Sequence, residues 1–345
     1  MTSTPPSVGI VGAGSVGIMT GYDLARSGAD VTYLVRPHRL EQLERPQVLY
    51  SYDDHSRHEF SGYAVATDVA SFTSRQHDLV VVTLDTAAMR AEAGVQLVKE
   101  LGAALRDTDT VVVLATVGLG VRPWFVEQSG MDEARVAIGS TALLIHEVAR
   151  AGLPIAPTVD RQLLESSDYG FRHLTSAAFM VDDSSPRAAE IVADLYAKPE
   201  APGAVTVPAD QMAVGVAGLA PILAWGLLGW RDLATEVDPA DPTWRLGVDA
   251  MQEIQRLPQF GRAGQEAADG SSAAGVLESF SAMAGISEPL DFAAFNAYHH
   301  GGKVNQQDRD LLDHARLLAR AEGLDTPALD ALISQLASHG RPEDV

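Results

Sequence analysis

The sequence predicts an α/β protein in which an N-terminal Rossmann-type, doubly wound sheet is followed by an all-helical C-terminal domain. Two observations predict the sheet. A glycine-rich turn, GAGSVG, follows the first apolar run, and β-branched runs then alternate with helical patterns. Such alternation is typical of a parallel sheet with helices on both faces. From Pro208 onward only helical patterns remain, so we place the two domains at 1–207 and 208–345.

The first apolar run, residues 8–11, predicts a buried strand that leads into Gly12-x-Gly14-x-x-Gly17 and then a helix. This context is what the dinucleotide fingerprint requires. Gly12 permits the turn, Gly14 lets the backbone approach a pyrophosphate, and Gly17 lets the helix pack close to the strand. Free N–H groups at the helix start would bind the phosphates. The alternative is a glycine-rich turn without a ligand. The predicted phosphate-binding residues are Gly12, Ala13, Gly14, Ser15, Val16 and Gly17.

The end of the second predicted strand, residues 30–35, indicates which dinucleotide binds. An NAD site usually carries Asp or Glu at this tip, where the carboxylate accepts hydrogen bonds from the ribose hydroxyls. Here Arg36 follows the strand, Arg39 comes three residues later, and no acid stands at the tip. Arg36 could pair with a 2′-phosphate as a planar donor. We therefore predict NADP(H) as the cofactor; the alternative is that Arg36 is a solvated charge.

Two further predicted strands end at the edge of the sheet where we expect the cofactor to bind. Residues 78–84 and 110–115 are apolar, β-branched runs, and Gly118 follows the second run. In doubly wound sheets, ligands bind at the carboxyl ends of the strands. We therefore expect Leu84 and Gly118 to lie beside the glycine turn and to contact the cofactor.

The remaining strands of the first domain are less regular. We expect strands at 48–52 and 63–67, with an exposed turn at 53–58 between them, and further strands at 173–181 and 204–207. The two histidines in the turn do not predict a metal site, because nothing orders them as ligands. We predict no metal site elsewhere in the chain.

Helices account for the predicted second domain, and they cover 210–234, 243–255, 273–284, 290–298, 306–322 and 327–336. A mobile loop is expected at 261–274, which is rich in Gly, Ala and Ser. Residues 214–230 carry no charge over 17 positions. That is shorter than the roughly 20 residues of a membrane span. The glycines and the proline within it favour a buried helix.

Composition limits the classes of partner. The chain has 46 acidic and 25 basic residues, for a net charge of −21, which argues against nucleic acid and anionic membranes. It has no cysteine, which excludes disulfides, thiolate nucleophiles and cysteine-ligated metals. The N-terminus, MTSTPPS, does not have the pattern of a secretion signal. We expect a cytoplasmic protein with a small-molecule substrate; the apolar helix leaves a homodimer open.

The motifs resemble those of the ketopantoate reductase family, within the 6-phosphogluconate-dehydrogenase-like superfamily. Similarity to the family's cofactor domain lies in GIVGAGSVG, YLVRPHRL, VVVTLDT and VVVLATVGLG, and similarity to its final helices in HHGGKVNQQD and ARAEGLDTPALDAL. The resemblance spans most of the chain and is more specific in the first domain. It implies an NADP-binding Rossmann domain, a helical domain for substrate binding and dimerisation, and reduction of a 2-oxo acid to a 2-hydroxy acid.

The sequence departs from the family's pattern where chemistry is expected. The family's lysine, which would stabilise and protonate an alkoxide, is expected at the start of the first helix after the boundary. Here that helix begins ADQMAV, and Gln211 takes the position by spacing. Val117 replaces an asparagine, Asp85 a lysine, and Gln307 a substrate-binding glutamate. The resemblance therefore carries over the fold and the cofactor, but not ketopantoate as the substrate.

Other polar residues could carry the chemistry instead. His300 and Lys303 lie in the segment HHGGK, where either side chain could protonate a carbonyl oxygen; the alternative is an exposed glycine turn. His146 could line a cleft or be a satisfied, half-buried histidine. Arg172 could bind a substrate carboxylate with two hydrogen bonds or pair with an acid such as Asp168.

These candidates complete the functional prediction. We predict catalytic roles for Lys303, His300 and Gln211, and substrate-binding roles for Arg172, His146 and Gln307. The predicted activity is NADPH-dependent reduction of a carbonyl, 2-oxo acid-like substrate other than ketopantoate, because the phosphate turn is intact while the catalytic positions have changed. The alternatives are a non-redox isomerase or cyclase on the same scaffold, and a catalytically silent NADPH-binding sensor.

Overall fold

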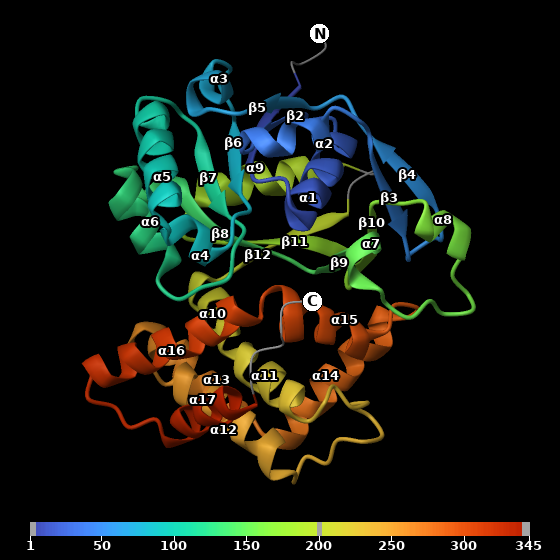
Figure 1. Cartoon of the computed structure of the whole chain (residues 1–345). Helices are drawn as coiled ribbons and strands as arrows, with labels where there is room; N and C mark the ends of the chain where they lie inside the picture. Colours follow the sequence, from blue (N-terminus) through green and yellow to red (C-terminus); the bar gives the residue numbers. More distant parts are fainter. Residues whose placement is uncertain (1–4, 199–201, 340–345) are drawn as a thin grey trace. The chain divides into compact units, whose positions relative to one another are not determined.

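The computed structural model describes residues 5–198 and 202–339, and its chain divides into two compact units (Figure 1). The first unit comprises Met1–Arg150 and Val159–Ala209. The second comprises Ala151–Thr158 and Asp210–Val345. Within the described residues, every strand belongs to the first unit, and the second unit is helical.

An eight-stranded sheet forms the centre of the first unit. From one edge to the other, its strands are β12 (Gly203–Val207), β11 (Ala177–Asp182), β8 (Val136–Thr141), β7 (Val111–Leu114), β6 (Leu79–Val82), β1 (Ser7–Val11), β2 (Asp30–Leu34) and β5 (Ala64–Ala66). The strands from β8 to β5 are parallel, whereas β11 runs antiparallel to β8. Strand β1 lies between β2 and β6, which is the topological switch point of a doubly wound sheet. The predicted fold class is therefore confirmed.

Helices cover both faces of this sheet. The helical segments of the first unit are α1 (Ser15–Arg26), η1 (Pro37–Arg39), α2 (Leu40–Leu43), α3 (Val69–Thr73), α4 (Thr86–Arg90), α5 (Glu92–Leu105), α6 (Val121–Ser129), η2 (Glu133–Arg135), α7 (Val148–Ala151), α8 (Arg161–Glu165) and α9 (Pro186–Tyr196). Alternate strand residues point to opposite faces. Val81 belongs to the core with Ile18 of α1 and Val192 of α9, while Val80 packs in the core with Val98 of α5.

A second, four-stranded sheet was only partly predicted. Its order is β4 (Arg57–Phe60), β3 (Gln47–Ser51), β10 (Tyr169–His173) and β9 (Leu143–Glu147). The exposed turn expected at 53–58 is therefore shorter than predicted, because β4 begins at Arg57 and pairs with β3. The single strand expected at 173–181 is also wrong. His173 ends β10 in this sheet, whereas β11 lies in the large sheet, and the three residues between them include no glycine or proline to signal the break.

The helical segments of the second unit follow the predicted order, but the helix expected at 210–234 is three consecutive segments that end at Leu227, and η4, α13 and η5 were not predicted. The segments are α10 (Ala209–Val214), η3 (Gly215–Gly218), α11 (Leu219–Leu227), α12 (Pro242–Gln255), η4 (Pro258–Phe260), α13 (Gly261–Gly270), α14 (Ala273–Ser287), α15 (Phe292–Tyr298), η5 (His299–Lys303), α16 (Asn305–Ala321) and α17 (Pro327–Ser338). Helix α13 replaces most of the mobile loop that we expected. Its Gly264 lies so close to α12 that a Cβ would be 2.1 Å from the Gln255 carbonyl oxygen. The glycine that indicated a loop instead permits close helix packing.

The apolar stretch after residue 208 is partly buried in the second unit, chiefly in its second half. Among the described residues, one helical stretch, Ala209–Leu227, is long and apolar enough by composition to cross a membrane, and core helices pass the same test. Within it, α11 buries Leu219, Leu223 and Trp225 and packs against α12. This burial agrees with the expectation of a core helix.

Candidate functional site

The GAGSVG turn has the geometry of a phosphate cradle. Gly12 has a φ of +104°, a conformation that favours glycine. A Cβ on Gly17 would lie 2.3 Å from the Gly12 carbonyl oxygen, so glycine is needed for α1 to approach the turn. A Cβ on Gly14 would meet no atom within 4 Å, so the space above Gly14 is open. This open cradle fits a pyrophosphate.

The start of helix α1 suits an anion. Gly14 is its N-cap residue, provides no side-chain cap, and is followed by a first turn without an acid. The first N–H groups of an α-helix have no intrahelical acceptors and carry partial positive charge. The backbone groups of Ser15, Val16 and Gly17 are the ones that would hold a phosphate.

Hydrogen bonds from the neighbouring strands fix the glycine turn. The Gly12 N–H donates to the Leu34 carbonyl oxygen at 3.0 Å. The Thr83 hydroxyl lies 3.1 Å from the Val11 carbonyl oxygen and 3.2 Å from that of Gly12, and donates to both. The cradle is therefore tied to β2 on one side and to the end of β6 on the other.

Two arginines follow β2. The side chain of one makes a hydrogen bond inside the glycine turn, whereas the side chain of the other is exposed. Arg39 donates from its NH2 group to the Ala13 carbonyl oxygen at 2.8 Å, inside the glycine turn. Arg36 is exposed, and within residues 5–198 and 202–339 its side chain makes no hydrogen bond or ion pair. Arg36 is available to an added anion, whereas Arg39 already supports the turn.

The strand ends expected around a cofactor lie along one edge of the sheet. Val11 pairs with Leu34 of β2 and with Val82 of β6, and Val82 pairs with Leu114 of β7, so the four parallel strands end level. Leu84 follows β6, and Gly118 follows β7. Leu84 lies beside the glycine turn, since a Cβ on Gly12 would be 3.1 Å from its Cδ2 atom, whereas Gly118 packs against Thr86 and Val121 in the loop after β7.

Helix α4 holds the loop that follows β7. The Thr86 hydroxyl donates to the Val117 carbonyl oxygen at 2.6 Å, and Arg90 donates to that of Leu119 at 2.9 Å. The Val117 side chain is 45% exposed. Asp85 caps α4 by accepting a 2.6 Å hydrogen bond from the Ala88 N–H. Neither Val117 nor ionised Asp85 offers a side-chain donor at this edge.

A family model connects this cradle with known proteins. Residues 8–149 match the model described as "Ketopantoate reductase PanE/ApbA". The matched segment runs from β1 through β9 and includes the glycine turn, both arginines and all four strand ends. The resemblance to the ketopantoate reductase family is thereby confirmed. None of the curated proteins matches the chain.

Solved structures share the fold over nearly the whole chain. A 2-dehydropantoate 2-reductase from Geobacter metallireducens is 19% identical, with 97% of this chain and 100% of that chain covered and a TM-score of 0.64. A probable 2-dehydropantoate 2-reductase from Bacillus subtilis is 17% identical, with 97% and 100% covered and a TM-score of 0.61. A D-mandelate dehydrogenase with NADH and anilino(oxo)acetate is 14% identical, with 96% and 97% covered and a TM-score of 0.62. At these identities, the likeness concerns the fold.

The second unit carries the predicted catalytic pair, His300 and Lys303, on the π-helical turn η5. Such turns are rare and frequently occur at functional sites. The Nδ1 atom of His300 lies 2.7 Å from Oδ2 of Asp308, in the first turn of α16. Lys303 is exposed. Sequence reasoning missed Asp308, although this acid stands on the buried face of α16 with Leu311, Leu312 and Ala315.

His299, the other histidine of η5, has a different environment. Its ring stacks on Phe295 with an interplanar angle of 17°, and it meets the His300 ring edge-on, with centroids 4.8 Å apart. Burial, aided by the charges of His300 and Lys303, lowers the pKa of His299 to about 3. His299 is therefore neutral near pH 7 and is no source of protons there.

The two glutamines predicted for the site lie on separate helices of the second unit. Gln211 is exposed on α10. Gln307 is partly exposed on α16, one residue before Asp308. Gln307 is therefore close in the chain to the His300–Asp308 pair, whereas Gln211 belongs to a different helix.

His146 has a structural environment in the four-stranded sheet. It is 2% exposed, and its Nε2 atom lies 3.0 Å from the Tyr52 hydroxyl. A Cβ on Gly170, its partner across the β9–β10 pair, would lie 2.7 Å from the same Nε2 atom. Burial and this packing separate His146 from solvent, which favours a structural role over the substrate-binding role, with more burial than the half-buried histidine that we expected.

Arg172 pairs with an acid other than the one we named. Its NH1 group lies 2.6 Å from Oδ1 of Asp53, while Asp168 is paired with Arg45. Asp53 also accepts from Nδ1 of His173 at 2.7 Å. The Arg172 guanidinium thus already binds a carboxylate, and this contact favours the structural alternative over a substrate clamp.

This contact belongs to a charge cluster that sequence reasoning missed. His173 lies between Asp53 and Asp23, its Nε2 atom 3.9 Å from Oδ2 of Asp23. Asp23 is 2% exposed in α1, and burial raises the pKa of its carboxyl. Burial also opposes the charge on His173, but Asp23 and Asp53 outweigh it and raise the pKa of His173 to about 9. The cluster links α1 to the four-stranded sheet by alternating charges.

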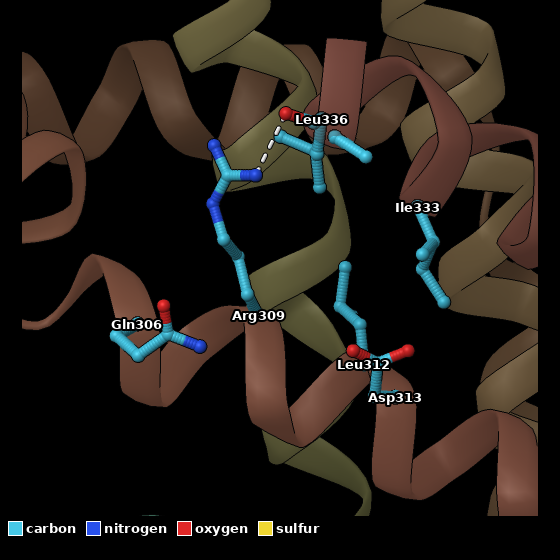
Figure 2. A pocket seen from close by; sticks show the side chains of 7 residues that line it. Gln306, Arg309, Leu312, Asp313, Ile333 and Leu336 are labelled. Atoms are coloured by element: carbon cyan, nitrogen blue, oxygen red, sulfur yellow. Dashed lines mark hydrogen bonds between the residues drawn. The ribbon is translucent and has the colours of Figure 1, made fainter. Parts of the chain in front are cut away.

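A pocket of about 260 Å³ lies between α16 and α17 (Figure 2). It is lined by Gln306, Arg309, Leu312, Asp313, Ile333, Leu336 and Ala337. Arg309 donates to the Leu336 carbonyl oxygen at 2.7 Å and to the Asn305 side chain at 2.8 Å (Figure 2 shows the first bond). None of the residues predicted as catalytic or substrate-binding is among those that line it, and its arginine is engaged at the end of α17.

Proposed function

We propose that this protein is an NADPH-dependent oxidoreductase that reduces the carbonyl group of a small 2-oxo acid-like substrate other than ketopantoate. The observation that carries the proposal is the open cradle at Gly14, at the start of a helix without an acid in its first turn. The family match over residues 8–149 supports a reductase, and two solved structures of similar fold are of D-mandelate dehydrogenase with NADH.

The preference for NADPH rests on Arg36. Its side chain is exposed and, within the described residues, makes no hydrogen bond or ion pair at the tip of β2. A guanidinium can bind a 2′-phosphate with two parallel hydrogen bonds. Arg39, which holds the Ala13 carbonyl oxygen, contributes a second positive charge to the same loop.

The changed positions are the reason for proposing a different substrate. Val117 offers no hydrogen bond from its side chain, and the Asp85 carboxylate is engaged in capping α4. When bound, the cofactor supplies the hydride. A proton must come from the protein or from solvent; the candidate donors remain His300 and Lys303, with Gln211 as a candidate neutral hydrogen-bond donor.

A fluorescence titration with NADPH and NADH tests the cofactor assignment. We expect Arg36→Ala to weaken NADPH binding by about 10- to 100-fold, in line with about 1.5–3 kcal/mol for a hydrogen-bonded charged group, and to change NADH binding by less than about 3-fold. Arg262→Ala is the matched control, because Arg262 is an exposed arginine on α13 with an 89% exposed side chain. Equal losses for both nucleotides would contradict the NADPH preference.

Turnover then separates the reductase from the alternatives. NADPH oxidation with a panel of 2-oxo acids, phenylglyoxylate and ketopantoate included, should show activity that is higher for another acid than for ketopantoate. Tight NADPH binding without oxidation by any panel member would support the sensor instead. Conversion of a substrate without NADPH consumption would support a non-redox enzyme.

A further inference from the structure

Arg39 contacts the glycine turn from outside it. It ends η1, the short turn that follows β2, and its NH2 group donates to the Ala13 carbonyl oxygen at 2.8 Å. Among the residues that the structure describes, this is the one hydrogen bond that its side chain makes. Arg39 is partly exposed, whereas Arg36 is exposed. The position of the Arg39 guanidinium relative to the cradle is therefore fixed by a direct contact with the turn.

The carbonyl groups of the turn are held by donors from neighbouring elements. Four consecutive carbonyl oxygens each accept a hydrogen bond from the protein, those of Val11, Gly12, Ala13 and Gly14. Three of them accept from uncharged groups of Thr83 and Ile18. The fourth, on Ala13, accepts from the charged guanidinium of Arg39. Hydrogen bonds from a charged donor are roughly twice as strong as neutral ones, so Arg39 makes the strongest of these contacts.

The backbone of η1 joins Arg39 to Arg36. The Arg39 N–H donates to the Arg36 carbonyl oxygen at 2.9 Å, and Pro37, which lies between them, has a φ fixed by its ring. The side chain that we propose for the 2′-phosphate and the side chain that holds the glycine turn therefore belong to one short, hydrogen-bonded element. Each has a separate target, because Arg39 reaches the turn and Arg36 does not.

We propose that Arg39 is a positioning residue that holds the glycine turn in the geometry that binds the cofactor's pyrophosphate, while Arg36 selects the 2′-phosphate. This inference rests on the proposed function. Arg39 acts through the Ala13 carbonyl oxygen, so its contribution does not depend on a 2′-phosphate. Loss of Arg39 should therefore weaken NADPH and NADH binding alike, whereas loss of Arg36 should weaken NADPH binding alone. Affinity and selectivity for the cofactor are divided between two arginines of one turn.

Hydrogen exchange of the full-length protein without nucleotide tests the turn itself. Arg39→Met keeps an unbranched side chain and removes the donor. We expect the Gly12 N–H, which donates to the Leu34 carbonyl oxygen, to exchange about 10-fold faster in this variant, while the global unfolding free energy changes little. Arg262→Met is the matched control, because the Arg262 side chain is 89% exposed. Unchanged exchange over residues 11–18 in Arg39→Met would overturn the positioning role.

Calorimetric titration with two fragments of the cofactor tests the division of roles. ADP-ribose carries the pyrophosphate without a 2′-phosphate, and 2′-AMP carries a 2′-phosphate without the pyrophosphate. We expect Arg39→Met to weaken ADP-ribose binding by about 10-fold or more. Binding of 2′-AMP should weaken by less than about 3-fold, because a charge that does not touch the ligand is screened by water and salt. Arg36→Ala should have the opposite pattern, and Arg39→Lys, which keeps a charged donor, should recover part of the ADP-ribose affinity.

The outcomes separate this inference from the function on which it rests. A wild type that binds NADPH, with equal ADP-ribose affinity in Arg39→Met, would overturn the positioning role and leave the cofactor assignment intact. Loss of 2′-AMP binding alone in Arg39→Met would make Arg39 a direct ligand of the 2′-phosphate, which also overturns the positioning role. A wild type that binds neither NADPH nor ADP-ribose would overturn both the inference and the proposed cofactor.

Discussion

The two units contain half-buried histidines with opposite charge behaviour. His173 in the first unit lies between Asp23 and Asp53, and its pKa is raised to about 9. His299 in the second unit stacks on Phe295, with no carboxylate among the described residues that shift its pKa, and burial lowers its pKa to about 3. Burial disfavours the charged form of both rings. The neighbouring carboxylates therefore decide the charge, and a buried histidine cannot be assigned a role from burial alone.

His300 has an environment between these extremes, with one carboxylate and a ring that reaches the surface. Asp308 gives it an orienting partner, as Asp53 does for His173. Among the described residues, His300 has one ion-pair partner, whereas His173 has two, because its Nε2 also faces Asp23. The three histidines thus differ in the number of carboxylates beside the ring, and we expect the consequences for stability to be largest where that number is largest.

Replacing His173, the positively charged histidine of the first unit, should have the largest effect on stability. His173→Ala leaves Asp23 buried without its positive partner, and breaking a buried pair typically costs about 3–5 kcal/mol. We expect a loss of that size in urea unfolding at pH 7. His38→Ala, at an exposed position in η1, is the control. The double variant Asp23→Asn/His173→Ala should recover much of the loss, and a His173→Ala loss below about 1 kcal/mol would contradict a charged cluster.

The raised pKa of His173 predicts that the protein loses stability at high pH. The folded pKa of His173, about 9, lies above the ordinary histidine value, so its stabilisation is complete below about pH 6.5. That stabilisation is lost as the pH rises through about 9, with a slope of at most about 1.4 kcal/mol per pH unit. The measurement is the difference in unfolding free energy between wild type and His173→Gln from pH 6 to pH 10. A flat difference would show that His173 is not charged in the folded state.

The uncharged histidine should be the easiest to replace. His299→Phe keeps a ring on Phe295 and removes the buried Nδ1 atom, which has no hydrogen-bond partner among the described residues. We expect the unfolding free energy at pH 7 to change by less than about 1 kcal/mol. Because the folded pKa is lowered, the wild type should lose stability as the pH falls from about 6.5 toward 3, and His299→Phe should lose less. A large loss in the variant at pH 7 would indicate a polar contact for His299.

The parts predicted well from sequence are those with local signals. The glycine turn, the strand at 8–11 and the long helices each occupy one continuous stretch whose spacing reports its structure. The His173 cluster has no such signal. Asp23, Asp53 and His173 are far apart in the chain and meet only because β3 pairs with β10 and that sheet packs against α1. Strand pairing of this kind cannot be read from one sequence.

The position of Asp308 in the sequence carries information that the sequence analysis did not use. It lies eight residues after His300, across a glycine pair, so the two side chains did not look adjacent. Yet Asp308 stands in the apolar stripe of α16, three residues before Leu311. Asp23 likewise lies on the buried side of α1, beside Tyr22 and Leu24. An acid within a buried stripe indicates a partner, although the sequence does not say which one.

The cap of α4 connects the ends of two strands, β6 and β7. The resemblance implies a lysine where Asp85 stands, and Asp85 holds the first turn of α4 through the Ala88 N–H. A lysine there would remove that cap at a cost of about 1 kcal/mol. Helix α4 in turn fixes the loop after β7 through Thr86 and Arg90. Removing this one cap would therefore loosen the loop after β7 as well as the loop after β6, so the two strand ends are mechanically coupled through α4.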